Sequence, residues 1–129
     1  MSSSPALGLA LLVAAAGGVG ATLRALLIHH IGVRRRDPLP LGTMVVNASG
    51  SLLLGILTGL SLYHGLGSHT LAVVGVGLCG GYTTWSTASW ETLHLLHTGH
   101  RSEALVYTVG GLAVCLAGAA AGIALTAWL

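Results

Sequence analysis

Charged residues are scarce in this 129-residue sequence, which has five arginines, no lysine and three acidic residues. Charged side chains make up 6% of the chain, whereas about a quarter is usual in soluble domains. Nucleic-acid-binding surfaces need clustered basic side chains, so this composition excludes nucleic acid as a partner. It also excludes a soluble helical core, because soluble helices carry polar residues along one face.

Phenylalanine and cysteine are also rare or absent. The sequence has no phenylalanine and only two cysteines, Cys79 and Cys115, which lie in apolar stretches without a pairing motif. We expect both cysteines to be small buried side chains, and their number gives no information about the redox compartment.

Long uncharged stretches dominate instead, and 53% of the residues are hydrophobic. About 20 apolar residues in a helix cross the hydrocarbon core of a membrane. The sequence therefore predicts an all-α membrane protein in which residues 1–129 form a single domain of four transmembrane helices. We expect these helices at about residues 6–28, 41–63, 71–95 and 104–128.

Basic residues are confined to one side of this predicted topology. Arg34, Arg35 and Arg36 lie between the first and second helices, and Arg101 lies between the third and fourth. The N-terminal end, the middle loop and the C-terminal end contain no Lys or Arg. Because loops rich in Lys and Arg stay in the cytoplasm, we expect a multi-pass protein with both termini outside the cell.

The third stretch contains an unusual polar run. Paired glycines, Gly80-Gly81, precede five hydroxyl side chains within residues 83–89. Lipid cannot hydrogen-bond to hydroxyls or to loosened backbone, so the run must be buried in protein or line a polar path. We expect the third helix to break after Gly80-Gly81 and to form an ion site there. Hydroxyls, the Trp85 indole N–H and a half-helix N-terminus suit a small anion, whereas freed carbonyls suit a cation.

Arg24 and Asn47 are the other polar residues that stand out inside the predicted helices. Arg24 either extends to the lipid headgroups as a structural residue or has a functional role, as charges inside membranes often do. Asn47 can donate and accept hydrogen bonds at once, so it either joins helices or lines a pore. The sequence leaves both pairs of alternatives open.

Glycines four residues apart favour close packing of helices. Gly55 and Gly59 lie in the second helix, and Gly118 and Gly122 lie in the fourth. Such faces serve contacts within a subunit and between subunits equally well. Since four helices of this size cannot easily enclose a pore alone, we expect an oligomer.

Other functions require residues that this sequence lacks. A small multidrug-type transporter needs a carboxylate in its first helix, which has none. A non-transporting scaffold subunit would explain the glycines but not the hydroxyl run. His94, His97 and His100 recur every third residue, but a carboxylate-bridged metal site needs the Glu-x-x-His step of Glu91–His94 twice. We therefore expect interfacial histidines and no enzyme.

Three ordered motifs resemble those of the Fluc (CrcB) family of fluoride channels, and the resemblance covers nearly the whole sequence. They are Gly17-Gly18-Val19-Gly20-Ala21-Thr22-Leu23-Arg24, Gly42-Thr43-Met44-Val45-Val46-Asn47-Ala48-Ser49-Gly50 and Gly80-Gly81-Tyr82-Thr83-Thr84-Trp85-Ser86-Thr87. The resemblance implies antiparallel dimers of four-helix subunits, each with a broken third helix, in the plasma membrane of a prokaryote. These dimers would export fluoride and so lower its cytoplasmic concentration. The resemblance also implies a structural Na⁺, not transported, which the backbone carbonyls of Gly80 and Thr83 would hold between subunits.

The same resemblance implies a fluoride path and shows where this protein departs from the family. The path residues are Asn47, Trp85, Ser86, Thr87, Ala88 and Tyr107, with Arg24 raising the anion concentration in the vestibule. The family has two phenylalanines where this sequence has Trp85 and Ala88. It also has hydroxyl side chains where this sequence has Gly111 and Cys115.

The departures and the arginine asymmetry both favour a partner subunit. An antiparallel homodimer needs subunits that insert in both orientations, which the asymmetry opposes. We therefore expect a heterodimer with a paralogous subunit of opposite orientation that supplies the missing rings, and the homodimer is the alternative.

Overall fold

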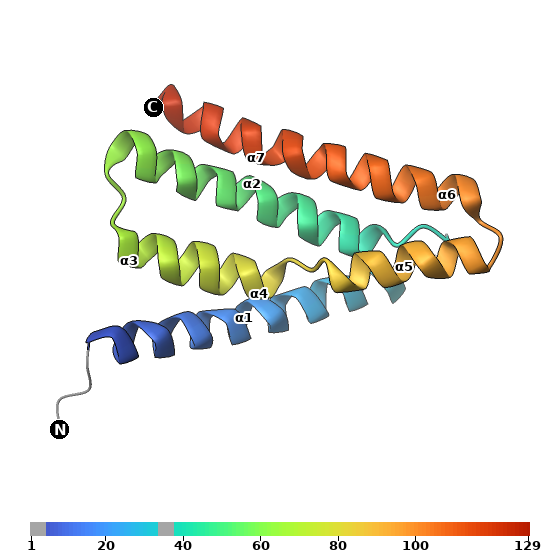
Figure 1. Cartoon of the computed structure of the whole chain (residues 1–129), viewed down its shortest axis with the longest axis horizontal. Coiled ribbons are helices and arrows are strands. Elements are labelled where there is room, and N and C mark those ends of the chain that lie inside the picture. The colour runs from blue at the N-terminus through green and yellow to red at the C-terminus, as the bar shows by residue number, and fades with distance from the viewer. Residues whose placement is uncertain (1–4, 34–37) are drawn as a thin grey trace.

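The computed structural model describes residues 5–33 and 38–129, which are helical and contain no strand (Figure 1). This confirms the predicted all-α class. In sequence order the elements are α1 (Pro5–Val33), α2 (Leu41–His64), α3 (Ser68–Thr70), η1 (Leu71–Cys79), α4 (Gly80–Tyr82), α5 (Ser86–His97), α6 (Arg101–Leu105), η2 (Val106–Gly110) and α7 (Gly111–Ala127). The elements η1 and η2 are π-helical, with backbone hydrogen bonds that span one residue more than in an α-helix.

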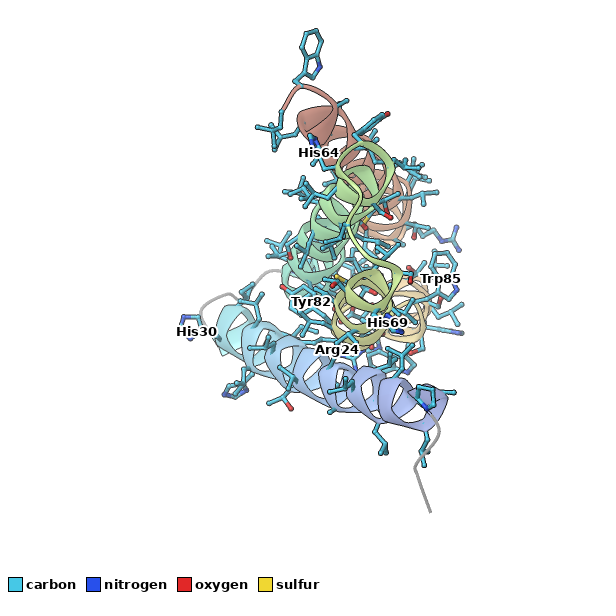
Figure 2. The ribbon with its side chains drawn as sticks, turned by 90° about the vertical axis from the view of Figure 1, so that its left-hand side faces the viewer. Arg24, His30, His64, His69, Tyr82 and Trp85 are labelled. Atoms are coloured by element: carbon cyan, nitrogen blue, oxygen red, sulfur yellow. The ribbon has the colours of Figure 1, made fainter. Side chains whose placement is uncertain are left out.

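The helices lie in a row, and α2 separates α7 from the third segment, which we define as residues 68–97 (Figure 1). The most extensive packing is between α2 and α7, and α1 packs against η1 and α4 of the third segment. Figure 2 shows the same order from one end of the row, with α1 lying across the other helices. The third segment is therefore covered by α1 on one side and by α2 on the other.

Two glycines with positive φ end the helices where the backbone reverses direction. Gly65 follows α2 with φ 70° and donates its N–H to the Leu60 carbonyl, and Gly99 follows α5 with φ 86°. Glycine reaches this left-handed conformation without the steric cost that a Cβ would add. The reversal at Gly65 makes the third segment run back along α2. The reversal at Gly99 then makes α6 and α7 run back along the other side of α2.

Within residues 5–33 and 38–129, three helices are long and apolar enough to cross a membrane. They are Pro5–Gly32, Leu41–His64 and Arg101–Ala127, the last of which combines α6, η2 and α7. In the third segment, Thr83–Trp85 separate the helical stretch ending at Tyr82 from α5, and neither piece reaches that length by itself.

The interruption does not directly follow the paired glycines. We expected the helix to break after Gly80-Gly81, but Gly80–Tyr82 are helical and Thr83 is the first extended residue, with ψ 160°. Gly81 serves packing instead, because a Cβ there would overlap the Gly17 carbonyl of α1, whereas nothing lies within 4 Å of a Cβ at Gly80. Gly81 thus allows the close approach of two helices, and another contact opens the backbone at Thr83.

The spaced glycines of the second and fourth predicted helices pack within the subunit. A Cβ at Gly55 would overlap the Ala119 carbonyl of α7, and one at Gly59 would overlap the Thr126 hydroxyl. From the other side, a Cβ at Gly122 would lie 2.5 Å from the Leu52 carbonyl of α2. Of the two contacts that the sequence left open, the structure shows the one within the subunit.

Few apolar side chains are buried inside this row of helices. Among the described residues the buried apolar side chains are Val46, Leu57, Cys79, Leu95, Ala104 and Tyr107. By contrast, Leu11 is 62% exposed and Leu116 is 63% exposed. So much exposed apolar surface on a single subunit indicates that lipid or another subunit covers the helices.

Candidate functional site

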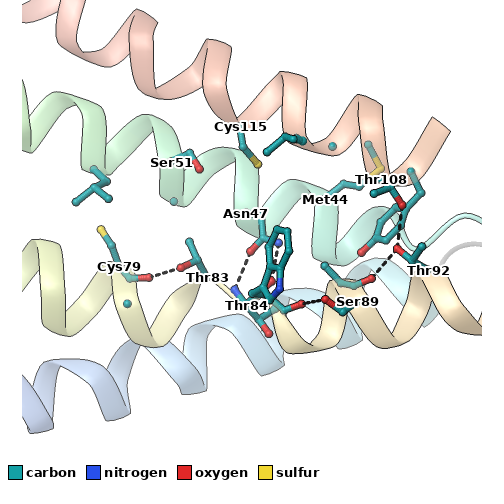
Figure 3. A pocket seen from close by; sticks show the side chains of 18 of the residues that line it. Met44, Asn47, Ser51, Cys79, Thr83, Thr84, Ser89, Thr92, Thr108 and Cys115 are labelled. Carbon is teal, nitrogen blue, oxygen red and sulfur yellow. Dashed lines mark hydrogen bonds between the residues drawn. The ribbon is translucent and has the colours of Figure 1, made fainter. Parts of the chain in front are cut away.

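An open groove of about 860 Å³ lies between α2, the third segment and η2–α7 (Figure 3). Its lining residues are Met44, Asn47, Gly50, Ser51, Leu54, Gly75, Val76, Cys79, Gly80, Thr83, Thr84, Trp85, Ala88, Ser89, Thr92, Leu93, Tyr107, Thr108, Gly111, Leu112 and Cys115. The groove runs past the interruption in the third segment. Its polar groups come from three walls, namely the interruption with α5 (Thr83, Thr84, Trp85, Ser89 and Thr92), α2 (Asn47 and Ser51) and η2 (Tyr107 and Thr108).

Asn47 of α2 is paired with the backbone of the interruption. Its Nδ2 donates to the Thr84 carbonyl over 2.8 Å, and its Oδ1 accepts the Thr84 N–H over 2.8 Å (Figure 3). In a continuous helix the Thr84 N–H would donate to the carbonyl of Gly80. The Asn47 amide replaces that bond and keeps the backbone open at a depth where water is scarce.

The Thr84 hydroxyl starts the next helix. It accepts the N–H of Thr87 over 3.2 Å and donates to the Thr87 hydroxyl over 2.9 Å. Trp85 holds the N-cap position and makes no side-chain cap bond, so the Thr84 hydroxyl one residue earlier provides a partner for an N–H of the first turn of α5. Thr84 therefore uses its backbone to bind Asn47 and its side chain to bind the first turn of α5.

Arg24 of α1 binds the other carbonyl at the interruption. Its Nη1 donates to the Thr83 carbonyl over 3.1 Å, between α1 and the third segment (Figure 2). The N–H and the hydroxyl of Thr83 both donate to the Cys79 carbonyl, each over 2.9 Å. The guanidinium of Arg24 thus ties α1 to the Thr83 carbonyl. This contact is not the extension to the lipid headgroups that was one of the two alternatives for Arg24.

Glu91 is a residue of this region that the sequence analysis did not select. Its Oε1 accepts the Thr43 hydroxyl over 3.0 Å, and its Oε2 accepts the Tyr107 hydroxyl over 2.6 Å. Both donors are buried, with Thr43 1% exposed and Tyr107 4% exposed. Helical spacing places Glu91 one turn after Ala88, on the face already predicted to line the path, and that spacing could have identified it.

Thr92 and Thr108 form a second contact between the third segment and η2. Their hydroxyl oxygens lie 3.0 Å apart, and both residues line the groove (Figure 3). Each hydroxyl also points to the carbonyl four residues earlier, at 2.9 Å for Thr92 and 2.8 Å for Thr108. Sequence reasoning missed this pair because each threonine alone is common in a membrane helix.

The structure brings some of the predicted path residues together and leaves others apart. Asn47, Trp85, Ala88 and Tyr107 line the groove, as do Gly80 and Thr83. Ser86 and Thr87 do not line it, because both hydroxyls lie against that of Thr84, at 3.5 and 2.9 Å.

Trp85 and Ala88 give the groove an open side. The Trp85 side chain is 79% exposed and projects away from the row of helices (Figure 2). The opposite wall of η2–α7 carries Gly111 and Cys115, which provide no hydroxyl. The walls of the groove therefore end at an open side where another surface can dock.

The described histidines and charged residues at the ends of the helices do not line the groove. The ring of His94 stacks on Trp90, with 5.2 Å between the ring centroids, and His64 binds the Thr126 carbonyl over 2.7 Å. Arg34, Arg35 and Arg36 lie outside the described residues.

Comparisons with known proteins identify relatives over most of the sequence. The profile of the family described as "CrcB-like protein, Camphor Resistance (CrcB)" matches residues 11–123. The sequence is 42% identical over 113 residues to the protein named Fluoride-specific ion channel FluC 1 of Leifsonia xyli subsp. xyli, a match that covers 88% of this protein and 82% of that one. It is 41% identical over 114 residues to Fluoride-specific ion channel FluC 2 of Cutibacterium acnes, covering 88% and 93% of the two proteins. The protein named Fluoride-specific ion channel FluC 2 of Haloarcula marismortui is 42% identical over 102 residues, covering 78% and 82%.

Proposed function

The protein belongs to the CrcB family, whose curated relatives are named as fluoride-specific ion channels, and we propose that it is a subunit of a channel that exports fluoride from the cell. Export would lower the fluoride concentration in the cytoplasm. An ion-channel family carries out no chemical conversion, so the protein is not an enzyme. The observation that carries the proposal is the interruption held open by Asn47 and Thr84 beside a groove lined with hydroxyl groups.

Hydrogen-bond donors along the groove support an anion path. Fluoride is small and strongly hydrated, so its water must be replaced by close donors at each step. One hydrogen of the Asn47 Nδ2 goes to the Thr84 carbonyl, which leaves its second hydrogen for an anion in the groove. Trp85 and Ala88 lie on the same path, and Ser86 and Thr87 would stiffen the start of α5 beside it. Tyr107 contributes a phenol hydroxyl at the part of the groove where it binds Glu91.

A second subunit would close the groove. The groove is open on the side where Trp85 projects, and a single subunit leaves large apolar side chains exposed. We propose an antiparallel dimer in which a paralogous subunit of opposite orientation supplies aromatic rings opposite Ala88, and a homodimer is the alternative. Trp85 can present a positive ring edge to an anion, whereas Ala88 offers only a methyl group.

The backbone at the interruption fits a structural Na⁺ between subunits. The Thr84 N–H is paired with Asn47, so the Gly80 carbonyl lacks the helical donor that it would otherwise have. The Thr83 carbonyl accepts one N–H from Arg24 and keeps a second lone pair. We propose that the carbonyls of Gly80 and Thr83 would hold the ion, which would tie the subunits together without being transported.

The third segment would provide a fourth crossing of the cell membrane. It runs alongside α2, and its helical pieces together match the length of that helix (Figure 1). With Arg101 and the arginines of the first loop on the cytoplasmic side, both termini would lie outside the cell.

Fluoride efflux from liposomes tests the proposed function. The purified protein, alone and with a co-expressed paralogous subunit, is reconstituted into vesicles loaded with NaF, and a fluoride electrode records release. We expect rapid release from one of the two preparations and no release of chloride from matched vesicles. Release no faster than from protein-free vesicles in both preparations would overturn the proposal.

A further inference from the structure

We propose that Thr92 and Thr108 together form an anion-binding step of the groove, a site for one dehydrated fluoride ion. This inference rests on the proposed function and names a part of its path. The two residues come from different walls, α5 and η2, and both face the groove. Their hydroxyl oxygens are 3.0 Å apart, so a single small ion can contact both.

The hydrogens of this pair are not committed to any one partner. Two hydroxyl hydrogens serve three contacts, namely the carbonyls of Ala88 and Ala104 and the contact between the two threonines. The Ala88 carbonyl is also within reach of the helical N–H four residues on in α5, and the Ala104 carbonyl is within reach of an N–H of the π-helical η2, so the bond from each hydroxyl is dispensable. Rotation of each hydroxyl about its Cβ–Oγ1 bond can therefore turn both hydrogens to an ion in the groove at small cost.

The other hydroxyls around this part of the groove do not offer such a pair. The Thr43 and Tyr107 hydroxyls donate to the Glu91 carboxylate. The Ser89 hydroxyl donates to the carbonyl four residues earlier over 2.9 Å, as Thr92 does, but no second side-chain hydroxyl among the described residues is hydrogen-bonded to it. On α7, Gly111 and Cys115 supply no hydroxyl. Thr92 and Thr108 are thus the pair of hydroxyls at this level that can coordinate an ion without breaking a hydrogen bond to the Glu91 carboxylate.

The residues next to Thr92 and Thr108 also favour weak binding of fluoride, which lets the ion pass rather than remain bound. Thr92 follows Glu91 in the sequence, and Thr108 follows Tyr107. An anion held by two hydroxyls next to a carboxyl group is bound less tightly than one held by a cationic group. Conduction requires binding that is favourable enough for entry and weak enough for release.

Isosteric substitutions test the pair. Thr92→Val and Thr108→Val remove the hydroxyls and keep the shape, whereas Thr92→Ser and Thr108→Ser keep the hydroxyls. We expect each valine variant to release fluoride about 10-fold more slowly, as for the loss of one hydrogen bond to a charged group. We expect the double valine variant to be little slower than either single one, and the serine variants to stay within about 3-fold of the unchanged protein. Thr58→Val is the control, because its hydroxyl donates only to the Leu54 carbonyl of its own helix over 2.8 Å and lies outside the groove.

A binding measurement separates this inference from the proposed function. Trp90 lies on α5 and Trp85 directly precedes it, so tryptophan fluorescence reports on this part of the groove. NaF is titrated into the detergent-solubilised protein while the fluorescence is recorded, with NaCl as the comparison. We expect a fluoride-dependent change that both valine variants weaken by about 10-fold and Thr58→Val leaves unchanged. Valine variants that assemble normally and release fluoride as fast as the unchanged protein overturn the inference. If the unchanged protein releases no fluoride either alone or with the paralogous subunit, the proposed function fails, and unchanged fluoride titrations of the valine variants then overturn the pair as well.

Discussion

The amide of Asn47 binds both backbone polar groups of Thr84, with 2.8 Å between the atoms in each bond. A residue of α2 thereby takes the place of a helical hydrogen bond of the third segment. The contact explains why the backbone opens at Thr83–Trp85 rather than at the paired glycines. It also explains why an open backbone is stable at this depth, since neither polar group of Thr84 is left without a partner.

Replacement of Asn47 should close or collapse the interruption. We expect Asn47→Leu, which has nearly the same shape, to lower the free energy of unfolding by about 2–4 kcal/mol, because two backbone groups lose their partners. Fluoride release should fall at least 10-fold. Thermal unfolding in detergent and liposome efflux measure the two effects, with Thr22→Val as the control, since the Thr22 hydroxyl binds only the Gly18 carbonyl of its own helix. An Asn47→Leu variant as stable and as active as the unchanged protein would show that the contact is dispensable.

Arg24 should act through its position rather than through its charge alone. Its Nη1 reaches the Thr83 carbonyl over 3.1 Å, and a lysine amine cannot reproduce the planar geometry of that donor. We therefore expect Arg24→Lys and Arg24→Gln to slow fluoride release by a similar factor, about 10-fold. Efflux at low and high ionic strength checks this. Full activity of Arg24→Lys, with loss of activity in high salt, would support a vestibule field instead.

Tyr107 should matter through its hydroxyl. Tyr107→Phe removes the donor 2.6 Å from the Glu91 Oε2 and leaves the Thr43 hydroxyl as the donor to that carboxyl group among the described residues. We expect a loss of about 1–3 kcal/mol in the free energy of unfolding and a clear fall in fluoride release. The control is Tyr63→Phe, because the Tyr63 side chain is 56% exposed at the end of α2. Equal behaviour of the two variants would argue against a role for the Glu91 contact.

Close packing of α2 on α7 should be sensitive to one methyl group. A Cβ at Gly122 would lie 2.5 Å from the Leu52 carbonyl and 2.6 Å from the Ile56 nitrogen, both of which are backbone atoms that cannot move away alone. We expect Gly122→Ala to destabilise the subunit by about 1–3 kcal/mol. Gly8→Ala is the matched control, since nothing lies within 4 Å of its Cβ position. Thermal unfolding and the yield of folded protein compare the variants, and identical melting curves would contradict this packing.

Aromatic rings placed on this subunit should relieve its need for a partner. We expect Ala88→Phe, combined with Trp85→Phe, to raise fluoride release from vesicles containing this protein alone by about 10-fold or more, because the added ring edges face the open groove. Ala88→Leu adds bulk without a polar ring edge and serves as the control. An unchanged rate in the aromatic variant, or an equal rise in the leucine variant, would count against the missing-ring explanation.

Composition and segment length were sufficient to predict an all-α membrane protein, and the three motifs were sufficient to identify the family. Both follow from local properties: apolar stretches must become helices in lipid, since every backbone group needs a partner within its own segment. The polar run in the third segment was also visible as a site, because hydroxyls in such number conflict with a lipid environment.

The tertiary structure decided how the polar residues are paired. The interruption lies at Thr83–Trp85 because Asn47 of another helix binds Thr84, and Gly81 instead lets α1 approach. Glu91, Thr92 and Thr108 join the site through contacts between α5 and η2, from residues 16 apart in the sequence. Such pairs depend on which helix faces are brought together in space, and periodicity within one segment carries no information about its neighbour's face.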